Sequence, residues 1–143
     1  MTVKAILDEK GRDVVTIHPD EAIGDAVRLM ASRRIGAVVA VRADGGIAGI
    51  LSERDVVRVL AEAGAEALSQ PVSSAMTVNV RRARESHTVH ELMEIMTEGR
   101  FRHLPVEDDG RLAGIVSIGD VVKRRIQDVE REAQEMRQYI ATA

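Results

Sequence analysis

The sequence contains no cysteine and no tryptophan, and its only aromatic residues are Phe101 and Tyr139. Without cysteine, disulfides, thiolate chemistry and cysteine-based zinc sites are excluded. Base stacking by a nucleic-acid-binding protein needs aromatic platforms, which are almost absent here. The formal net charge of −3 also argues against a large basic footprint for nucleic acid. We therefore expect no nucleic-acid partner.

Long apolar stretches are lacking too. The N-terminal residues 1–8 (MTVKAILD) are too short and too polar for a signal peptide or a membrane span. With the absence of cysteine, this favours a cytoplasmic protein with no membrane partner. Hydrophobic residues make up 45% of the 143 residues, which suits one soluble globular domain with an aliphatic core.

The chain repeats itself. Residues 49–57 (GILSERDVV) recur as residues 114–122 (GIVSIGDVV), a shift of 114 − 49 = 65. An Asp-Gly pair precedes each segment, at Asp44-Gly45 and at Asp109-Gly110. The lead-ins to the two copies, residues 3–7 and 72–76, are also alike. The repeat therefore spans nearly everything before the C-terminal tail.

Each copy reads as strand, helix, strand, strand, helix. Residues 14–17 form a β-branched run typical of a strand, and apolar positions at helical spacing follow from Ile23. The equivalent helix of the second copy begins at a capping box, residues 88–91. Asp-Gly between apolar runs predicts a hairpin in each copy. Because one unit has too little core to stand alone, we expect both to pack into one module of α/β (α+β) class.

These patterns divide the chain into three segments. Residues 1–68 hold the first repeat with its lead-in, residues 69–127 the second repeat, and residues 128–143 a helical extension. Gly64 predicts the end of a helix near the boundary, where Pro71 redirects the chain.

The tail carries apolar residues spaced 4, 3, 4, 3 and 4 apart, which is a heptad pattern. They are Val122, Ile126, Val129, Ala133, Met136 and Ile140. Two interpretations stay open: a long helix packed on its own domain, or a helix paired across a homodimer.

The motif Ser-x-x-Asp follows an apolar strand in both copies, as Ser52 with Asp55 and as Ser117 with Asp120. One interpretation is a capping box that only starts a helix. The other is a ligand site, because a helix N-terminus suits phosphate and a carboxylate can accept bonds from two ribose hydroxyls. Arg54, inside the first motif, can pair with phosphate.

The duplicated motif, preceded by IGAVVAV at residues 35–41 and FRHLPV at residues 101–106, resembles a tandem pair of CBS domains, named after cystathionine β-synthase. The resemblance covers about residues 1–127 and implies two repeats related by a pseudo-twofold axis. It also implies clefts between them for adenosine-containing ligands, with the Ser on phosphate and the Asp on ribose. The ligand-binding residues it implies are Val15, Thr16, Ile35, Gly36, Ala37, Ser52, Arg54 and Asp55 in the first copy, and Asn79, Val80, Phe101, Arg102, His103, Leu104, Ser117, Gly119 and Asp120 in the second.

The resemblance implies a stand-alone regulatory module, not an enzyme, which binds AMP, ADP, ATP, S-adenosylmethionine or NAD(H) and signals occupancy to an unknown regulated protein. We expect no catalytic residue, no metal and no required cofactor. Two alternatives stay open: a nucleotide- or metal-dependent enzyme using the same cleft, and a purely structural dimerisation protein.

The two copies differ inside the motif, where Glu53-Arg54 becomes Ile118-Gly119. The second site lacks the local arginine, while Gly119 frees space. We therefore expect the two sites to prefer different ligands.

Overall fold

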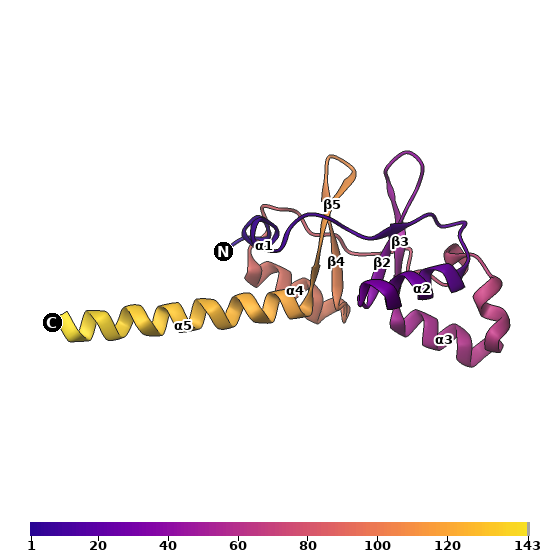
Figure 1. Ribbon diagram of the computed structural model, residues 1–143. Coiled ribbons are helices and arrows are strands. Elements are labelled where there is room, and N and C mark those ends of the chain that lie inside the picture. The colour runs from indigo at the N-terminus through magenta and orange to yellow at the C-terminus, as the bar shows by residue number, and fades with distance from the viewer. Residues whose placement is uncertain (143) are drawn as a thin grey trace.

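Two β-hairpins lie side by side at the centre of the computed structural model, which describes residues 1–142 (Figure 1). The first joins β2 (Ala37–Val41) to β3 (Ile47–Ser52), and the second joins β4 (His103–Asp108) to β5 (Arg111–Ser117). Both are antiparallel, and the last residue of each second strand, Ser52 or Ser117, pairs with the first residue of its partner strand. Both predicted Asp-Gly turns are present, and Gly45 and Gly110 have positive φ angles of 87° and 76°.

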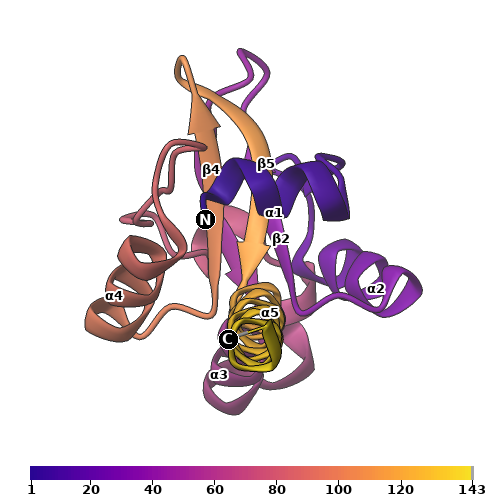
Figure 2. The same ribbon diagram turned by 90° about the vertical axis from the view of Figure 1, so that its left-hand side faces the viewer.

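Helices precede and follow each hairpin. They are α2 (Ile23–Arg33) and α3 (Glu53–Ala63) in the first copy, and α4 (Val89–Gly99) and α5 (Ile118–Thr142) in the second. Seen along α5, helices α2 and α4 flank the hairpins on opposite sides (Figure 2). The predicted order of helix, strand, strand and helix is therefore confirmed in both copies, and the fold is mixed α/β with two such repeats and a long C-terminal helix.

The opening strand of the repeat differs between the copies. In the first, β1 (Thr16–Ile17) pairs in parallel with β2. In the second, the pairing shrinks to one parallel bridge between Ala83 and Val106, so the predicted strand there is wrong as a strand. The physical reason lies in the composition of residues 81–84: three arginines replace the β-branched run, and long charged side chains pack poorly on a half-buried sheet surface.

The two lead-in segments, residues 1–10 and 70–76, are exchanged between the copies. Helix α1 (Val3–Lys10) packs in the core of the second copy, where the N–H of Val3 donates to the His87 carbonyl at 2.8 Å. The short 3₁₀ helix Val72–Ser74 packs in the core of the first copy, where the N–H of Val72 donates to the Glu21 carbonyl at 2.8 Å. Each copy therefore depends on a segment that precedes the other in sequence.

A small apolar contact joins the two copies near the pseudo-twofold axis. Ala37, Ile50 and Val80 are buried there, with Ile115 packed against them. This contact sets the relative orientation of the two copies. It therefore determines how the first residues of the strands and helices in one copy face those in the other.

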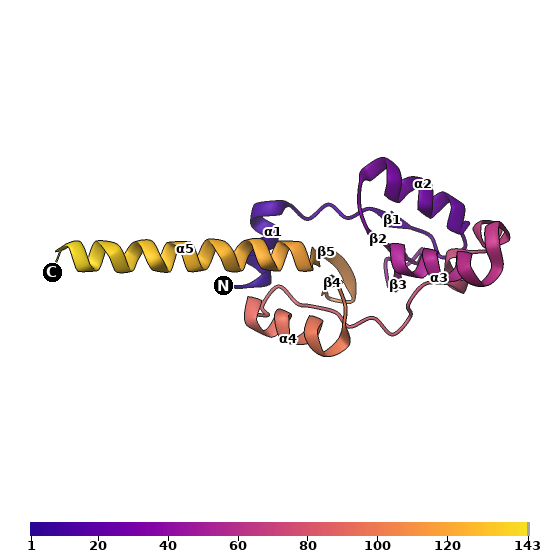
Figure 3. The same ribbon diagram turned by 90° about the horizontal axis from the view of Figure 1, so that it is seen from below.

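Helix α5 begins against the second copy and then leaves it, as Figure 3 shows from below. Near its base, Arg124 lies 3.2 Å from Glu9 of α1, and Asp128 is its last buried residue. Residues 129–142 are exposed, so the interpretation of a tail packed along its own domain is wrong. No helix within residues 1–142 is both long and apolar enough to cross a bilayer.

Candidate functional site

The first Ser-x-x-Asp motif lies where β3 passes into α3. The Ser52 hydroxyl accepts from the Asp55 N–H at 3.3 Å, while a carboxyl oxygen of Asp55 accepts from the Ser52 N–H at 3.0 Å. This capping box is therefore confirmed. The other Asp55 oxygen accepts from Arg58 at 3.3 Å. The Asp55 side chain remains 14% exposed.

A cavity of about 290 Å³ adjoins this motif and crosses the boundary between the two copies. This volume is near the lower end of the range typical of small-molecule sites, roughly 300–1,000 Å³. Its lining residues are Gly36, Ile50, Ser52, Glu53, Arg54, Asp55, Thr77, Gly99, Arg100, Phe101, Arg102 and His103. The space therefore joins a helix N-terminus with free polar groups to a strand start carrying an aromatic ring and cationic side chains.

The cavity brings together seven of the residues expected from the sequence: Gly36, Ser52, Arg54, Asp55, Phe101, Arg102 and His103. The resemblance assigns the first four to one site and the last three to another, but here they face the same space. The reason is the pseudo-twofold arrangement, which places the start of β4 opposite the start of α3.

The other expected residues lie elsewhere. Ala37 and Val80 are buried in the contact between the copies, and Leu104 in the core of the second copy. Val15 and Ile35 pack against the core of the first copy. Thr16 and Asn79 are exposed. Ser117, Gly119 and Asp120 form the second motif.

Five lining residues were not expected from the sequence: Ile50, Glu53, Thr77, Gly99 and Arg100. Thr77 reaches the cavity because its backbone pairs with Ile50, with N–H to carbonyl distances of 3.1 and 2.8 Å. Arg100 ends α4 and corresponds to Arg34, which ends α2, so the internal repeat held a signal for it. Thr77 had no such local signal, because its position depends on the exchanged lead-ins.

The second motif is engaged differently. The Asp120 carboxyl accepts from the Ser117 N–H at 2.8 Å and from the Lys10 ammonium of α1 at 2.6 Å. Burial raises the pKa of Asp120, but the hydrogen bonds from Lys10 and Ser117 outweigh it, so the pKa lies below its usual value. The space beside Asp120 and Lys10 is only about 80 Å³. The two motifs are thus equivalent in sequence but not in access.

His103 lies between the two motifs. Its side chain approaches Gly36 of the first copy, and its backbone pairs with Ser117 across the β4–β5 ladder. Burial lowers the pKa of His103, and the positive charge of Lys10 lowers it further, while Asp120 and Glu53 oppose the change. The lowered pKa favours the neutral imidazole near pH 7, which has one donor and one acceptor nitrogen.

Two other hollows do not contain either motif's Ser and Asp. A groove of about 650 Å³ runs between residues 82–86 and the β4–β5 turn, where Arg82 pairs with Glu107. A second, of about 660 Å³, lies between α2 and α3 and shares Gly36 and Glu53 with the candidate site. Among residues 1–142, no three His, Asp or Glu side chains gather as metal ligands would.

Known proteins match this architecture closely. A crystal structure of a CBS-domain-containing protein from Agrobacterium tumefaciens is 58% identical, with a TM-score of 0.84, covering 87% of this chain and 92% of that one. A CBS domain pair solved with 5-methylthioadenosine and S-adenosyl-L-methionine is 26% identical, with a TM-score of 0.80, covering 90% of this chain and 98% of that one.

A CBS domain-containing mitochondrial protein from Arabidopsis thaliana is 31% identical over 97% of this chain and 71% of its own length. Residues 3–62 and 72–126 each match the CBS domain itself, which accounts for both copies of the repeat. With the duplicated hairpins, the exchanged lead-ins and the paired Ser-x-x-Asp motifs, these matches show that the chain belongs to the CBS domain family.

Proposed function

We propose that this chain is a non-catalytic regulatory module that binds an adenosine-containing ligand in the cavity beside Ser52. The observation that carries the proposal is the cavity itself, which sets Ser52 and Asp55 opposite Phe101 and His103. Its first support is chemical: a phosphate suits the N–H groups that begin α3, and a ribose suits a carboxylate. Its second support is the relative solved with 5-methylthioadenosine and S-adenosyl-L-methionine.

The lining of the cavity combines polar and apolar groups. Ser52 and Asp55 supply polar groups, while Phe101 and Ile50 supply apolar surface. We assign the phosphate to Ser52, the ribose to Asp55 and the base to the apolar surface of Ile50. AMP, ADP, ATP, S-adenosylmethionine and NADH all carry the adenosine that this arrangement requires.

The output of binding goes to a partner protein or to a second copy of this chain. In the proposed mechanism, a ligand in the cavity touches both copies of the repeat and so links their relative position to occupancy. The exposed apolar face of α5 is the surface that we propose to form a homodimer.

Binding without turnover is tested first. A ligand present at about 100 times its Kd stabilises a protein by roughly 2.7 kcal/mol. For a domain of this size, that raises the melting temperature by roughly 5–10 °C. AMP, ATP, NADH and S-adenosylmethionine are compared by thermal shift, and the recovered nucleotide is checked by chromatography. Conversion of the nucleotide would favour the enzyme alternative, and no shift with any ligand at millimolar concentration would refute the proposal.

Asp55→Asn separates binding from capping. Losing a charged acceptor costs roughly 1.5–3 kcal/mol, or about 10- to 150-fold in affinity by calorimetry. Loss of the cap alone costs only about 1 kcal/mol of stability and leaves affinity unchanged. The matched control is Asp25→Asn, because Asp25 also pairs with an arginine three residues later in a first helical turn but lies outside the cavity. Equal affinity in both variants would favour a purely structural role.

A further inference from the structure

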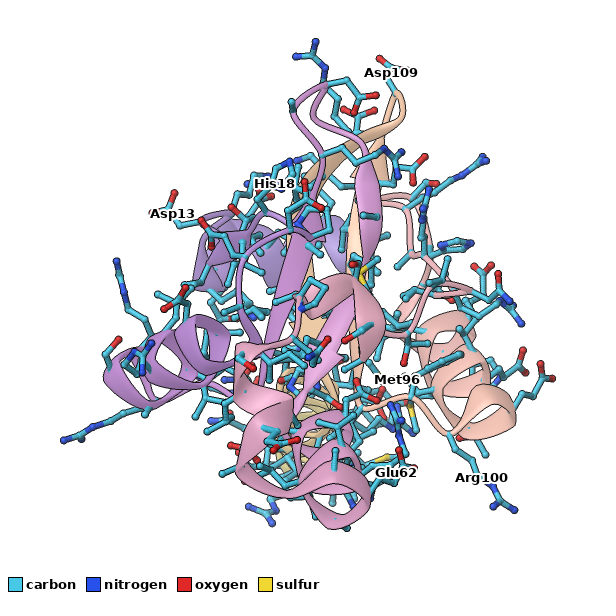
Figure 4. All side chains as sticks on the ribbon, turned by 90° about the vertical axis from the view of Figure 1, so that its right-hand side faces the viewer. Asp13, His18, Glu62, Met96, Arg100 and Asp109 are labelled. Atoms are coloured by element: carbon cyan, nitrogen blue, oxygen red, sulfur yellow. The ribbon has the colours of Figure 1, made fainter. Side chains whose placement is uncertain are left out.

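Three arginines stand around the mouth of the Ser52 cavity. Arg54 comes from α3, Arg100 from the end of α4, and Arg102 from the approach to β4. All three are exposed. Figure 4 shows Arg100 at the end of α4, on the rim of the molecule. The mouth of the cavity is therefore framed by positive charge from both copies.

These guanidinium groups are uncommitted. In the part of the chain that the structure describes, no salt bridge engages Arg54, Arg100 or Arg102, whereas Arg58 and Arg124 are both paired. The cavity also contains two carboxylates, but Asp55 already accepts from Ser52 and Arg58. Only Glu53 remains to offset three arginines, so the mouth favours anions.

Arg100 also stands in an unfavourable backbone conformation. Its φ and ψ angles are 56° and 34°, in the left-handed region where glycine or asparagine usually ends a helix. A residue with a Cβ atom is disfavoured there by about 1–2 kcal/mol. Arg34 ends α2 in the same way, with φ and ψ of 56° and 47°. Both copies thus have an arginine at a position where glycine fits the backbone better.

We infer that this cavity selects adenosine ligands with two or more phosphates over the monophosphate and over S-adenosylmethionine. The inference rests on the proposed function of the same site. With the first phosphate at Ser52, a second and third phosphate would extend beyond it toward the arginines that line the same cavity. There the arginines can bind them through paired, charge-assisted hydrogen bonds. S-adenosylmethionine carries no phosphate for these arginines to bind.

The test compares ATP, ADP, AMP and S-adenosylmethionine by calorimetry at fixed ionic strength. We expect affinity to fall in the order ATP, ADP, AMP, with ATP at least about tenfold tighter than AMP. Arg100→Gln should weaken ATP about fivefold to tenfold and leave AMP within about twofold. Because the arginines are exposed, the preference for ATP should also shrink as salt is raised.

Arg34→Gln is the matched control, since it removes the guanidinium of the equivalent left-handed arginine, which does not line this cavity, and should leave both affinities unchanged. AMP or S-adenosylmethionine binding as tightly as ATP would overturn the inference while leaving the proposed function intact. So would an equal loss of AMP and ATP in Arg100→Gln. If no adenosine ligand binds the wild-type chain, the proposed function fails, and this inference fails with it.

Discussion

Asp55 and Asp120 hold equivalent positions in the two copies, yet different cations face them. Asp55 meets Arg58, one turn further along its own helix, at 3.3 Å. Asp120 meets Lys10 at 2.6 Å, and Lys10 also donates to the carbonyl of Ile115 at 3.0 Å. A side chain from α1 thus occupies the space in which a ribose would approach Asp120. The inequality of the two sites comes from this contact as well as from the change of Glu53-Arg54 to Ile118-Gly119.

Replacing Lys10 by methionine should open the second site. Met keeps most of the aliphatic stem but removes the ammonium, so Asp120 is freed while α1 stays packed. We expect wild type to bind one nucleotide per chain and Lys10→Met to bind two, with a stability loss of about 1 kcal/mol or less. Calorimetric stoichiometry measures this. Lys4→Met, which breaks the exposed Lys4–Asp8 pair on the same helix, should stay at one. An unchanged stoichiometry in Lys10→Met would show that the ammonium does not close the site.

At the level of single residues, the sequence predicted those whose positions follow from the spacing of a local motif. Ser52 and Asp55 were expected from their spacing after a strand, and the capping geometry is confirmed. Thr77 and Lys10 were not expected, because they reach their positions through lead-ins distant in sequence. The contact from Lys10 to Asp120 spans 110 residues, a separation at which no periodicity or motif spacing carries information.

Among the secondary-structure elements, strands β3 and β5 each contain a glycine that makes the exchange of the lead-in segments possible. A Cβ atom on Gly49 of β3 would lie 2.6 Å from the Thr77 carbonyl oxygen. A Cβ atom on Gly114 of β5 would lie 2.9 Å from a methyl group of Leu7. Both glycines therefore allow a neighbouring segment of the chain to approach closely. This explains why each of the two repeated strands contains a glycine at this position.

Alanine at these glycines should have unequal effects. At Gly49 the new methyl meets the Thr77 backbone, which is held on Ile50 by two hydrogen bonds, so strand and lead-in must separate. At Gly114 the new methyl meets the end of the Leu7 side chain, which can shift more easily. We expect Gly49→Ala to cost about 2–3 kcal/mol and Gly114→Ala about 1 kcal/mol. Urea unfolding measures the difference, and equal or reversed costs would contradict this account.

The elements themselves were largely predictable. Alternating apolar runs around Asp-Gly specified both hairpins, and Gly64 ends α3 as expected, with a φ angle of 68°. The opening strand of the second copy failed because residues 81–84 keep the position of a strand but not its β-branched composition. The exchange of α1 was beyond local reasoning, since an amphipathic helix of eight residues is equally compatible with either copy.

Within the described residues, the part of α5 beyond Asp128 is exposed and projects from the rest of the protein (Figure 3). Val122, Ile126 and Val129 are about half exposed, and Met136 and Ile140 are more so. In proteins most of the stability of a helix comes from packing its apolar face, so a partner surface would stabilise the projecting part of α5. Its heptad spacing gives an apolar seam (residues 122, 126, 129, 133, 136 and 140) that is complementary to another copy of itself.

We therefore expect a homodimer held by this seam. Sedimentation at micromolar concentration should give twice the chain mass of 15.6 kDa. Val129→Glu should weaken the dimer strongly, because it buries a charge in the seam. Gln138→Glu is the control on the opposite face of the helix and should leave the dimer intact.

Truncation after Gln127 removes most of the seam and should give a monomer that still binds nucleotide, because no residue that lines the Ser52 cavity lies beyond Gln127. A wild-type monomer at all concentrations would refute the dimer itself. A truncated chain that remains dimeric would instead assign the interface to the repeats, where Val57 of α3 and Ile118 of α5 are also exposed.

If a ligand in the cavity changes the relative position of the two repeats, we expect that change to reach α5 at its base. There Arg124 pairs with Glu9 of α1 and with Asp128 of α5 itself. Nucleotide should then shift the dimerisation constant of the full chain, and an unchanged constant at saturating ligand would separate binding from assembly.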